Sequence, residues 1–240
     1  HCPSDDSISD EGGRTPLQEA TEKTADGAAT YVLVMPQGER SLHDACAKER
    51  IAGIDADAVV AIVQQLAECL AYLHSMRTVH MDIKQRNVIR LDDGRFILCD
   101  LDAATIMQQR GGGKSSTAYC SPELAKQKFV SAAIRREVAS MQEGGQDIGE
   151  SGELQSATSS QDVWSFGVVL LELCIGRSLF SQDTANDELV HEADCVSLCA
   201  WRTANEELLS QVFASSDAFS CDGPARLETI RVFARDLIGR

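Results

Sequence analysis

The sequence lacks the features that mark membrane-spanning and secreted proteins. No apolar run approaches the roughly 20 residues that a membrane helix needs, and the first residues are polar and acidic, unlike a signal peptide. The nine cysteines are odd in number, scattered and without a Cys-x-x-Cys pair, which argues against disulfides or a zinc site. We therefore expect reduced thiols, a location in the cytoplasm or nucleus rather than outside the cell, and no contact with a membrane.

Positive charge is also scarce. Lysine and arginine number 22 against 37 acidic residues, which gives a formal net charge of −15. Because nucleic-acid binding depends on positive side chains at the phosphates, this balance predicts no nucleic-acid partner. The composition, 43% hydrophobic and 25% charged, is otherwise ordinary for a globular protein.

A group of polar residues with a chemistry of its own lies between residues 82 and 100. Asp82, Lys84 and Asn87 are close in sequence, and Asp100 follows after the segment RLDDGRFIL. An Asp-Gly turn between apolar residues predicts a β-hairpin there, which would bring Asp100 beside Asn87. Asn87 and Asp100 can offer oxygen ligands to Mg²⁺, Asp82 can orient a hydroxyl and accept its proton, and Lys84 can neutralise a moving phosphoryl group. The cluster therefore predicts phosphoryl transfer.

These residues resemble the catalytic loop of protein kinases, in which His-Arg-Asp is followed by Lys and Asn at fixed spacing. Here the loop reads His80-Met81-Asp82-Ile83-Lys84-Gln85-Arg86-Asn87, and the metal motif Asp-Phe-Gly is replaced by Asp100-Leu101-Asp102. The resemblance implies that Asp82 is the catalytic base and that Lys84 steadies the phosphoryl group. It also implies that Asn87 and Asp100 hold Mg²⁺ and that His80 braces the loop.

Two further segments extend the resemblance. Residues 100–123 are similar to a kinase activation segment, in which Ser116 or Thr117 takes the place of the threonine that contacts the catalytic loop of serine/threonine kinases. The segment ends in Ser-Pro-Glu, close to the family's Ala-Pro-Glu, so Glu123 is expected to support the structure. The motif Asp-x-Trp-Ser-x-Gly is intact from Asp162 onward, and Asp162 is implied to accept hydrogen bonds from the catalytic-loop backbone.

The apolar run Tyr31–Met35 predicts a buried strand, ended by Pro36. In the resemblance it leads into the hinge that binds the adenine of ATP, which implies contacts from Met35, Gln37 and Gly38. Apolar spacing predicts helices over 41–48, 55–76 and 162–176, the last one buried, and further helices over 187–212 and 225–237. Cys195 and Cys199 are expected on one helix face, and Trp201 and Phe213 in the core.

These patterns predict a mainly α fold with a small β component, similar to the large C-terminal lobe of a kinase over residues 31–240. Residues 1–30 are polar and acidic and predict disorder, as does an insert over 131–161. No Gly-rich loop and no Val-Ala-Ile-Lys strand precede Tyr31, so we expect the N-terminal lobe to be largely absent and the chain to belong with partner domains in a longer protein. Glu123 finds no arginine partner in the sequence, which predicts a buried carboxylate without its counter-charge.

Three functions fit this reading. The first is a serine/threonine protein kinase that transfers the γ-phosphate of ATP to protein substrates, with ATP and Mg²⁺ as cofactors and little turnover by this chain alone. The second is a pseudokinase that acts as a scaffold. The third is a small-molecule phosphotransferase of the aminoglycoside-kinase type, which the Asp100-Leu101-Asp102 motif resembles. Met81 replaces the arginine that reads a phosphorylated activation segment, so activity should not depend on that phosphorylation.

Overall fold

The structure, a computed structural model, describes residues 20–23, 29–32, 34–111, 115–128, 134, 137–138, 140, 156–183, 185–201 and 232. The chain divides into two units, residues 1–37 and 38–240. In the first unit, strands β1 (Ala20–Lys23) and β2 (Ala29–Val32) pair antiparallel, with Ala20 opposite Val32.

This hairpin bears on two predictions. Residues 20–23 and 29–30 lie in the segment for which disorder is expected, and they form strands that pair residue by residue, from Ala20 with Val32 to Lys23 with Ala29. The predicted buried strand at Tyr31–Met35 begins and ends earlier, as β2, and Val34 and Met35 are exposed at 58% and 66%.

The second unit begins with a three-stranded antiparallel sheet in the order β3 (Gly38–Ser41), β5 (Val88–Leu91), β6 (Phe96–Leu98). The predicted hairpin is confirmed as β5 and β6, and Gly94 adopts φ of 84° at its turn, a conformation that glycine takes without strain. A second, two-stranded sheet pairs β4 (Thr78–Val79) with β7 (Thr105–Ile106). Both sheets are small, and they fix the two ends of the loop that carries Asp82.

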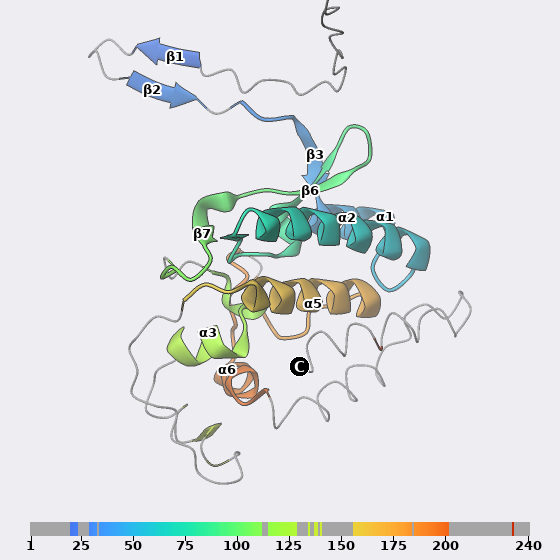
Figure 1. Cartoon of the computed structure of the whole chain (residues 1–240). Helices are drawn as coiled ribbons and strands as arrows, with labels where there is room; N and C mark the ends of the chain where they lie inside the picture. The colour runs from blue at the N-terminus through green and yellow to red at the C-terminus, as the bar shows by residue number, and fades with distance from the viewer. Residues whose placement is uncertain are drawn as a thin grey trace, which may run out of the picture. The chain divides into compact units, whose positions relative to one another are not determined.

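Two helices precede this loop, as the apolar spacing predicted. Helix α1 (Leu42–Glu49) is capped by the Ser41 hydroxyl, which accepts from the N–H of Asp44, and α2 (Ala56–Ser75) is capped by Asp55. Helix α2 is long and apolar enough to cross a membrane by length and composition alone, a test that core helices of globular proteins also pass. One face of α2 packs against β6 and α5 (Ser159–Ile175) (Figure 1).

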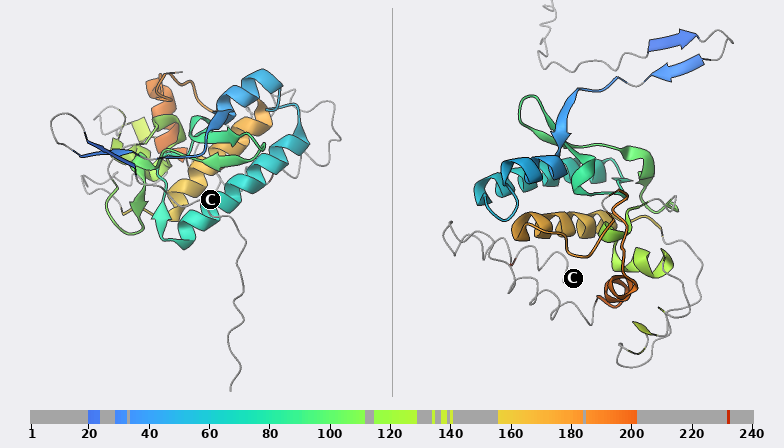
Figure 2. Two further views of the ribbon diagram at one scale, coloured as in Figure 1. Left: turned by 90° about the horizontal axis from the view of Figure 1, so that it is seen from above. Right: turned by 180° about the vertical axis from the view of Figure 1, so that it is seen from behind.

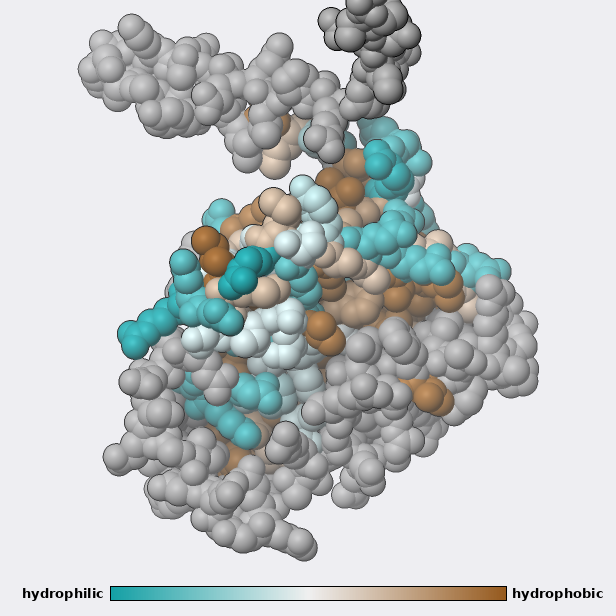
Figure 3. All heavy atoms as spheres, in the orientation of Figure 1, coloured by the Kyte–Doolittle hydropathy of each residue, from teal (hydrophilic) through white to brown (hydrophobic). Residues whose placement is uncertain are grey.

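Helix α5 forms the centre of this unit. Nearly all of its residues are buried, as the absence of a polar face predicted, and it begins in a capping box at Thr158 and ends at Gly176 with φ of 73°. Both views in Figure 2 place α5 alongside α2. On the face in Figure 3, apolar side chains show between the layers of α2 and α5, while the outer surface of α2 is more hydrophilic.

Two shorter helices, α3 (Pro122–Lys128) before α5 and α6 (Glu192–Cys199) after it, contact each other. Trp201, which follows α6, packs edge-on against Trp164 of α5 with ring centroids 5.0 Å apart, and against Phe180 at 6.2 Å. The core position of Trp201 is therefore confirmed. Cys195 and Cys199 are both buried in α6, and all seven cysteines among the described residues are free thiols.

The structure describes only parts of the predicted insert over 131–161. Among them, Ile134 and Val138 are buried, and residues 156–161 contribute a β-bridge and the start of α5. The helix expected over 187–212 begins only at Glu192, because Asp187 has a left-handed φ of 56° and Leu189 bridges Gln182. Phe213 and all of the predicted 225–237 helix except residue 232 lie outside the described residues.

Candidate active site

The loop between β4 and the 3-10 helix η1 (Gln85–Asn87) is anchored to helix α5 by one buried carboxylate. Asp162 is fully buried, and its two oxygens accept hydrogen bonds from the backbone N–H of His80 at 2.8 Å and of Met81 at 2.9 Å. A contact of 2.9 Å also joins Asp162 to the ring of His74. The contact that the kinase resemblance implied for Asp162 is therefore present.

His80 lies in the core, with no exposed surface, and its Nε2 is 3.1 Å from the carbonyl oxygen of Cys99. This contact ties the loop to the residue before Asp100. Met81 is buried with φ of 70°, and a Cβ built on Gly111 would lie 3.1 Å from its terminal methyl group. The side chain at this position therefore packs against the middle of the activation segment.

Asp82 lies at the meeting point of three donors. Its carboxylate accepts from the backbone N–H of Ser116 at 2.8 Å and from the side-chain amide of Asn87 at 3.1 Å, and Lys84 Nζ is 3.5 Å away. Burial raises the pKa of Asp82, but the Ser116 hydrogen bond, the charge of Lys84 and the Asn87 hydrogen bond together lower it below the ordinary value. Asp82 is therefore ionised at neutral pH and able to accept a further hydrogen bond from a hydroxyl.

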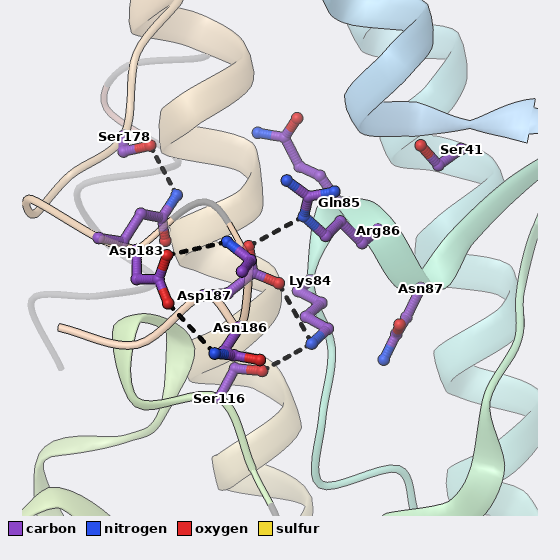
Figure 4. A network of polar contacts seen from close by, with 12 residues as sticks. Ser41, Lys84, Gln85, Arg86, Asn87, Ser116, Ser178, Asp183, Asn186 and Asp187 are labelled. Atoms are coloured by element: carbon purple, nitrogen blue, oxygen red, sulfur yellow. Dashed lines mark hydrogen bonds and ion pairs between the residues drawn. The ribbon is translucent and has the colours of Figure 1, made fainter.

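Lys84 contacts groups from three segments of the chain (Figure 4). Besides Asp82, its ammonium contacts the hydroxyl of Ser116 at 2.8 Å and the carboxylate of Asp187 at 3.2 Å. Asp187 is 4% exposed, and its second oxygen is 3.1 Å from Nε of Arg86. The two cations of the loop therefore share one carboxylate from the segment that follows α5.

Of the two residues expected to contact the catalytic loop, the structure selects Ser116. Both its N–H and its hydroxyl reach the loop, at Asp82 and Lys84. Thr117 instead faces the segment after α5: its hydroxyl donates to Glu188 and accepts from the N–H of Leu189 at 2.8 Å. The two neighbours therefore belong to different contacts.

Asn87 and Asp100, the predicted Mg²⁺ ligands, are joined through the β5–β6 hairpin. The N–H of Cys99 donates to the carbonyl oxygen of Asn87 at 2.9 Å, which places the next residue, Asp100, at the same end of the hairpin. The amide nitrogen of Asn87 donates to the backbone oxygen of Asp82 at 2.8 Å, which leaves its amide oxygen as the ligand atom. One amide and one carboxylate fit Mg²⁺, which keeps its other positions for water and phosphate. No group of three or more His, Cys, Asp or Glu that could hold a metal occurs in the described part of the chain.

A second buried carboxylate, Glu172 of α5, lies below the loop. It accepts from the Tyr119 hydroxyl at 2.8 Å and from the Gln85 amide at 2.9 Å. Burial raises the pKa of Glu172 to about 7, although both hydrogen bonds lower it. The hydroxyl of Ser165 donates to the backbone oxygen of Tyr119 at 2.8 Å, so α5 holds the end of the activation segment at two points.

The remaining predicted site residues lie elsewhere. Glu123 is exposed in the first turn of α3, so the expected burial of this carboxylate is wrong; a helix N-terminus also favours negative charge. Met35 and Gln37 belong to the first unit and Gly38 to the second, and all three are exposed. Asp187 and Glu172 were not predicted as site residues; only the mid-helix position of Glu172 between apolar residues indicated a buried role.

Comparison with known proteins relates part of this site to a known family. Residues 19–135 match the family model of the protein kinase domain. The match begins before the predicted boundary at residue 31 and therefore includes the β1–β2 hairpin. The motif around Asp162 lies beyond the match.

The relatives are serine/threonine kinases and a kinase kinase. Serine/threonine-protein kinase ppk16 of Schizosaccharomyces pombe is 30% identical over 157 residues, which is 62% of this chain and 18% of that protein. Mitogen-activated protein kinase kinase 7 of Arabidopsis thaliana is 29% identical over 141 residues, 57% of this chain and 36% of that protein. Serine/threonine-protein kinase 36 of Mus musculus is 29% identical over 128 residues, 52% of this chain and 8% of that protein. The chain thus spans a minor part of the length of each of these relatives.

Proposed function

We propose that this chain is part of a serine/threonine protein kinase that transfers the γ-phosphate of ATP to hydroxyl groups of protein substrates. The observation that carries the proposal is the placement of Asp82, whose ionised carboxylate is held by Ser116, Asn87 and Lys84 at the end of a buried, anchored loop. In a loop that only faces solvent, these three contacts to one carboxylate would not be expected.

In this proposal Asp82 accepts a hydrogen bond from the substrate hydroxyl and orients it for attack. Lys84 lies beside that position and neutralises the negative charge of the phosphoryl group in transfer. Asn87 and Asp100 would hold Mg²⁺, which supplies charge neutralisation on the phosphates of ATP. We keep as predictions the adenine contacts of Met35, Gln37 and Gly38 and a cytoplasmic location. Because Met81 stands in place of the arginine that reads a phosphorylated activation segment and has no positive charge to bind a phosphate, activity should not depend on that phosphorylation.

A scaffold function without catalysis is the second candidate, and one contact favours it. The ammonium of Lys84 is 3.2 Å from the buried carboxylate of Asp187, which neutralises the charge that phosphoryl transfer needs. A scaffold can keep this ion pair permanently. In a kinase, the ion pair would compete with the phosphoryl group for the ammonium of Lys84 during catalysis.

A thermal melt of the chain with and without magnesium-ATP separates the two. If nucleotide binds, ligand at 100 times its dissociation constant should stabilise the fold by about 2.7 kcal/mol. We expect this increase in the parent and in Asp92→Asn, a matched control in the exposed hairpin turn, but not in Asp100→Asn. A cooperative melt whose midpoint is the same with and without nucleotide in all three proteins would favour the scaffold function.

A further inference from the structure

A cavity of about 440 Å³ opens beside the candidate active site. It lies where α1, the catalytic loop and the segment after α5 meet. Its wall consists mainly of polar side chains together with two apolar ones, contributed by His43, Arg86, Arg177, Ser178, Leu179, Phe180, Ser181, Gln182 and Asp187.

The charge of this cavity differs from that of the chain. The whole chain has a net charge of −15, yet the lining has two arginines, Arg86 and Arg177, and a single carboxylate, Asp187. The Gln182 amide donates to the Ser178 hydroxyl at 2.7 Å, and the hydroxyls of Ser178 and Ser181 add hydrogen-bond donors. Guanidinium groups are well suited to bind carboxylates and phosphates, because their fork of N–H groups matches two oxygens at once.

The cavity is linked to the catalytic loop through Asp187. One oxygen of this carboxylate lies 3.1 Å from Nε of Arg86 in the cavity wall, and the other lies 3.2 Å from Nζ of Lys84 (Figure 4). Lys84 is in turn 3.5 Å from Asp82. The carboxylate of Asp187 thus already lies between the two cations of the loop, Lys84 and Arg86. The cavity extends from this carboxylate to Arg177.

We propose that this cavity binds an acidic side chain of the protein substrate, either a carboxylate or a phosphate, next to the hydroxyl that is presented to Asp82. The proposal rests on the function proposed above. A residue of an extended peptide spans about 3.3–3.6 Å, so a side chain two or three positions from the reacting hydroxyl can reach the cavity. The acidic group is bound by Arg177 together with Arg86, and it sets which hydroxyls are chosen.

Peptide binding to the full 240-residue chain tests this without requiring turnover. The probes are three fluorescein-labelled peptides, each with a central serine and with glutamate, phosphoserine or glutamine two residues to either side. Fluorescence anisotropy gives their dissociation constants for the parent, Arg177→Gln, Arg177→Lys and Arg95→Gln. Arg95 is exposed in the hairpin turn and does not line the cavity, so its variant removes the same charge elsewhere.

We expect the parent and Arg95→Gln to bind at least one acidic peptide about tenfold more tightly than the glutamine peptide, since a charge-assisted hydrogen bond supports that difference. Arg177→Gln should lose this preference and Arg177→Lys should keep most of it. The glutamate and phosphoserine arms tell the two anions apart. Equal binding of all three peptides, no binding of any, or equal losses in Arg177→Gln and Arg95→Gln would overturn the proposal.

Phosphoryl transfer to the same peptides is measured separately. Charge-dependent binding without transfer would show that this chain alone does not transfer phosphate, and it would keep the acidic subsite. Transfer to all three peptides without any charge preference would support the kinase activity and reject the acidic subsite.

Discussion

The carboxylate of Asp162 and the backbone N–H of His80 are 2.8 Å apart, although the two residues lie 82 positions apart in sequence. This bond, with the one from Met81, fixes the catalytic loop on the most buried helix of the fold. The position of Asp82 therefore depends on α5 as well as on the contacts within the loop. Any change that loosens this bond should affect stability and site geometry together.

Substitution Asp162→Ala should lower the free energy of unfolding by about 2–6 kcal/mol. It leaves two buried N–H groups without an acceptor, and each such group costs roughly 1–3 kcal/mol. Asp162→Asn keeps one acceptor oxygen and should cost less. Urea unfolding of both variants, with the exposed Asp57→Ala of α2 as control, measures the difference. A loss below that of Asp57→Ala would show that Asp162 does not anchor the loop.

The sequence predicted those parts of the molecule in which a local pattern determines the structure. Ser41 and Asp55 cap their helices, and the Asp-Gly turn produces the β5–β6 hairpin, because capping and turn formation need only neighbouring residues. The family motif placed Asp82 beside Lys84 and Asn87, and Asp162 under the loop. These predictions depended on short spacings or on an intact motif.

The contacts that were missed join segments that no local pattern connects. Asp187 lies 103 positions from Lys84, in a stretch whose apolar spacing resembled a helix, and its left-handed backbone conformation is set by the ion pairs and by Ala118, which donates to its carbonyl oxygen. Glu172 looked like one polar residue in an apolar helix, and its partners come from two other segments. Tertiary packing therefore decided both.

Glu172 should make stability depend on pH in the neutral range. Its folded pKa, about 7, lies above the ordinary value of 4.5, so the folded state binds the proton more tightly than the unfolded state. This contribution is fully present below pH 4.5 and is lost as pH rises to about 7, by an amount on the order of 3 kcal/mol. Glu172→Gln stays neutral and should flatten the curve over that interval.

The measurement is urea unfolding at intervals between pH 4.5 and 8, for the parent, Glu172→Gln and the exposed Glu192→Gln. Asp82, whose pKa is lowered, works in the opposite direction but only in acid below the ordinary Asp value, so it does not obscure this interval. Parallel curves for all three proteins would contradict the raised pKa of Glu172.

Gly38 should resist substitution for a packing reason that is independent of nucleotide binding. A Cβ at this position would lie 2.2 Å from Cγ2 of Ile89 on the paired strand β5. Gly38→Ala should therefore cost about 1–3 kcal/mol, the usual range for overpacking. In the background Ile89→Ala, which removes Cγ2, the same change should cost clearly less, and thermal melts of the four proteins measure this coupling. An equal cost in both backgrounds would reject the clash.

Substitutions of Ser116 and Thr117 should separate effects on catalysis from effects on stability, because the two adjacent hydroxyls contact different partners. Ser116→Ala removes the contact to Lys84 but keeps the N–H that binds Asp82, so phosphoryl transfer should fall several-fold while the melt changes little. Thr117→Val leaves the N–H of Leu189 without its acceptor, which should cost roughly 1–3 kcal/mol of stability. Transfer to a serine peptide and urea unfolding are measured on both variants. If both variants lose stability equally and keep equal activity, Ser116 has no special position at the site. If only Ser116→Ala loses turnover at full stability, the hydroxyl acts on Lys84 in the transfer step itself.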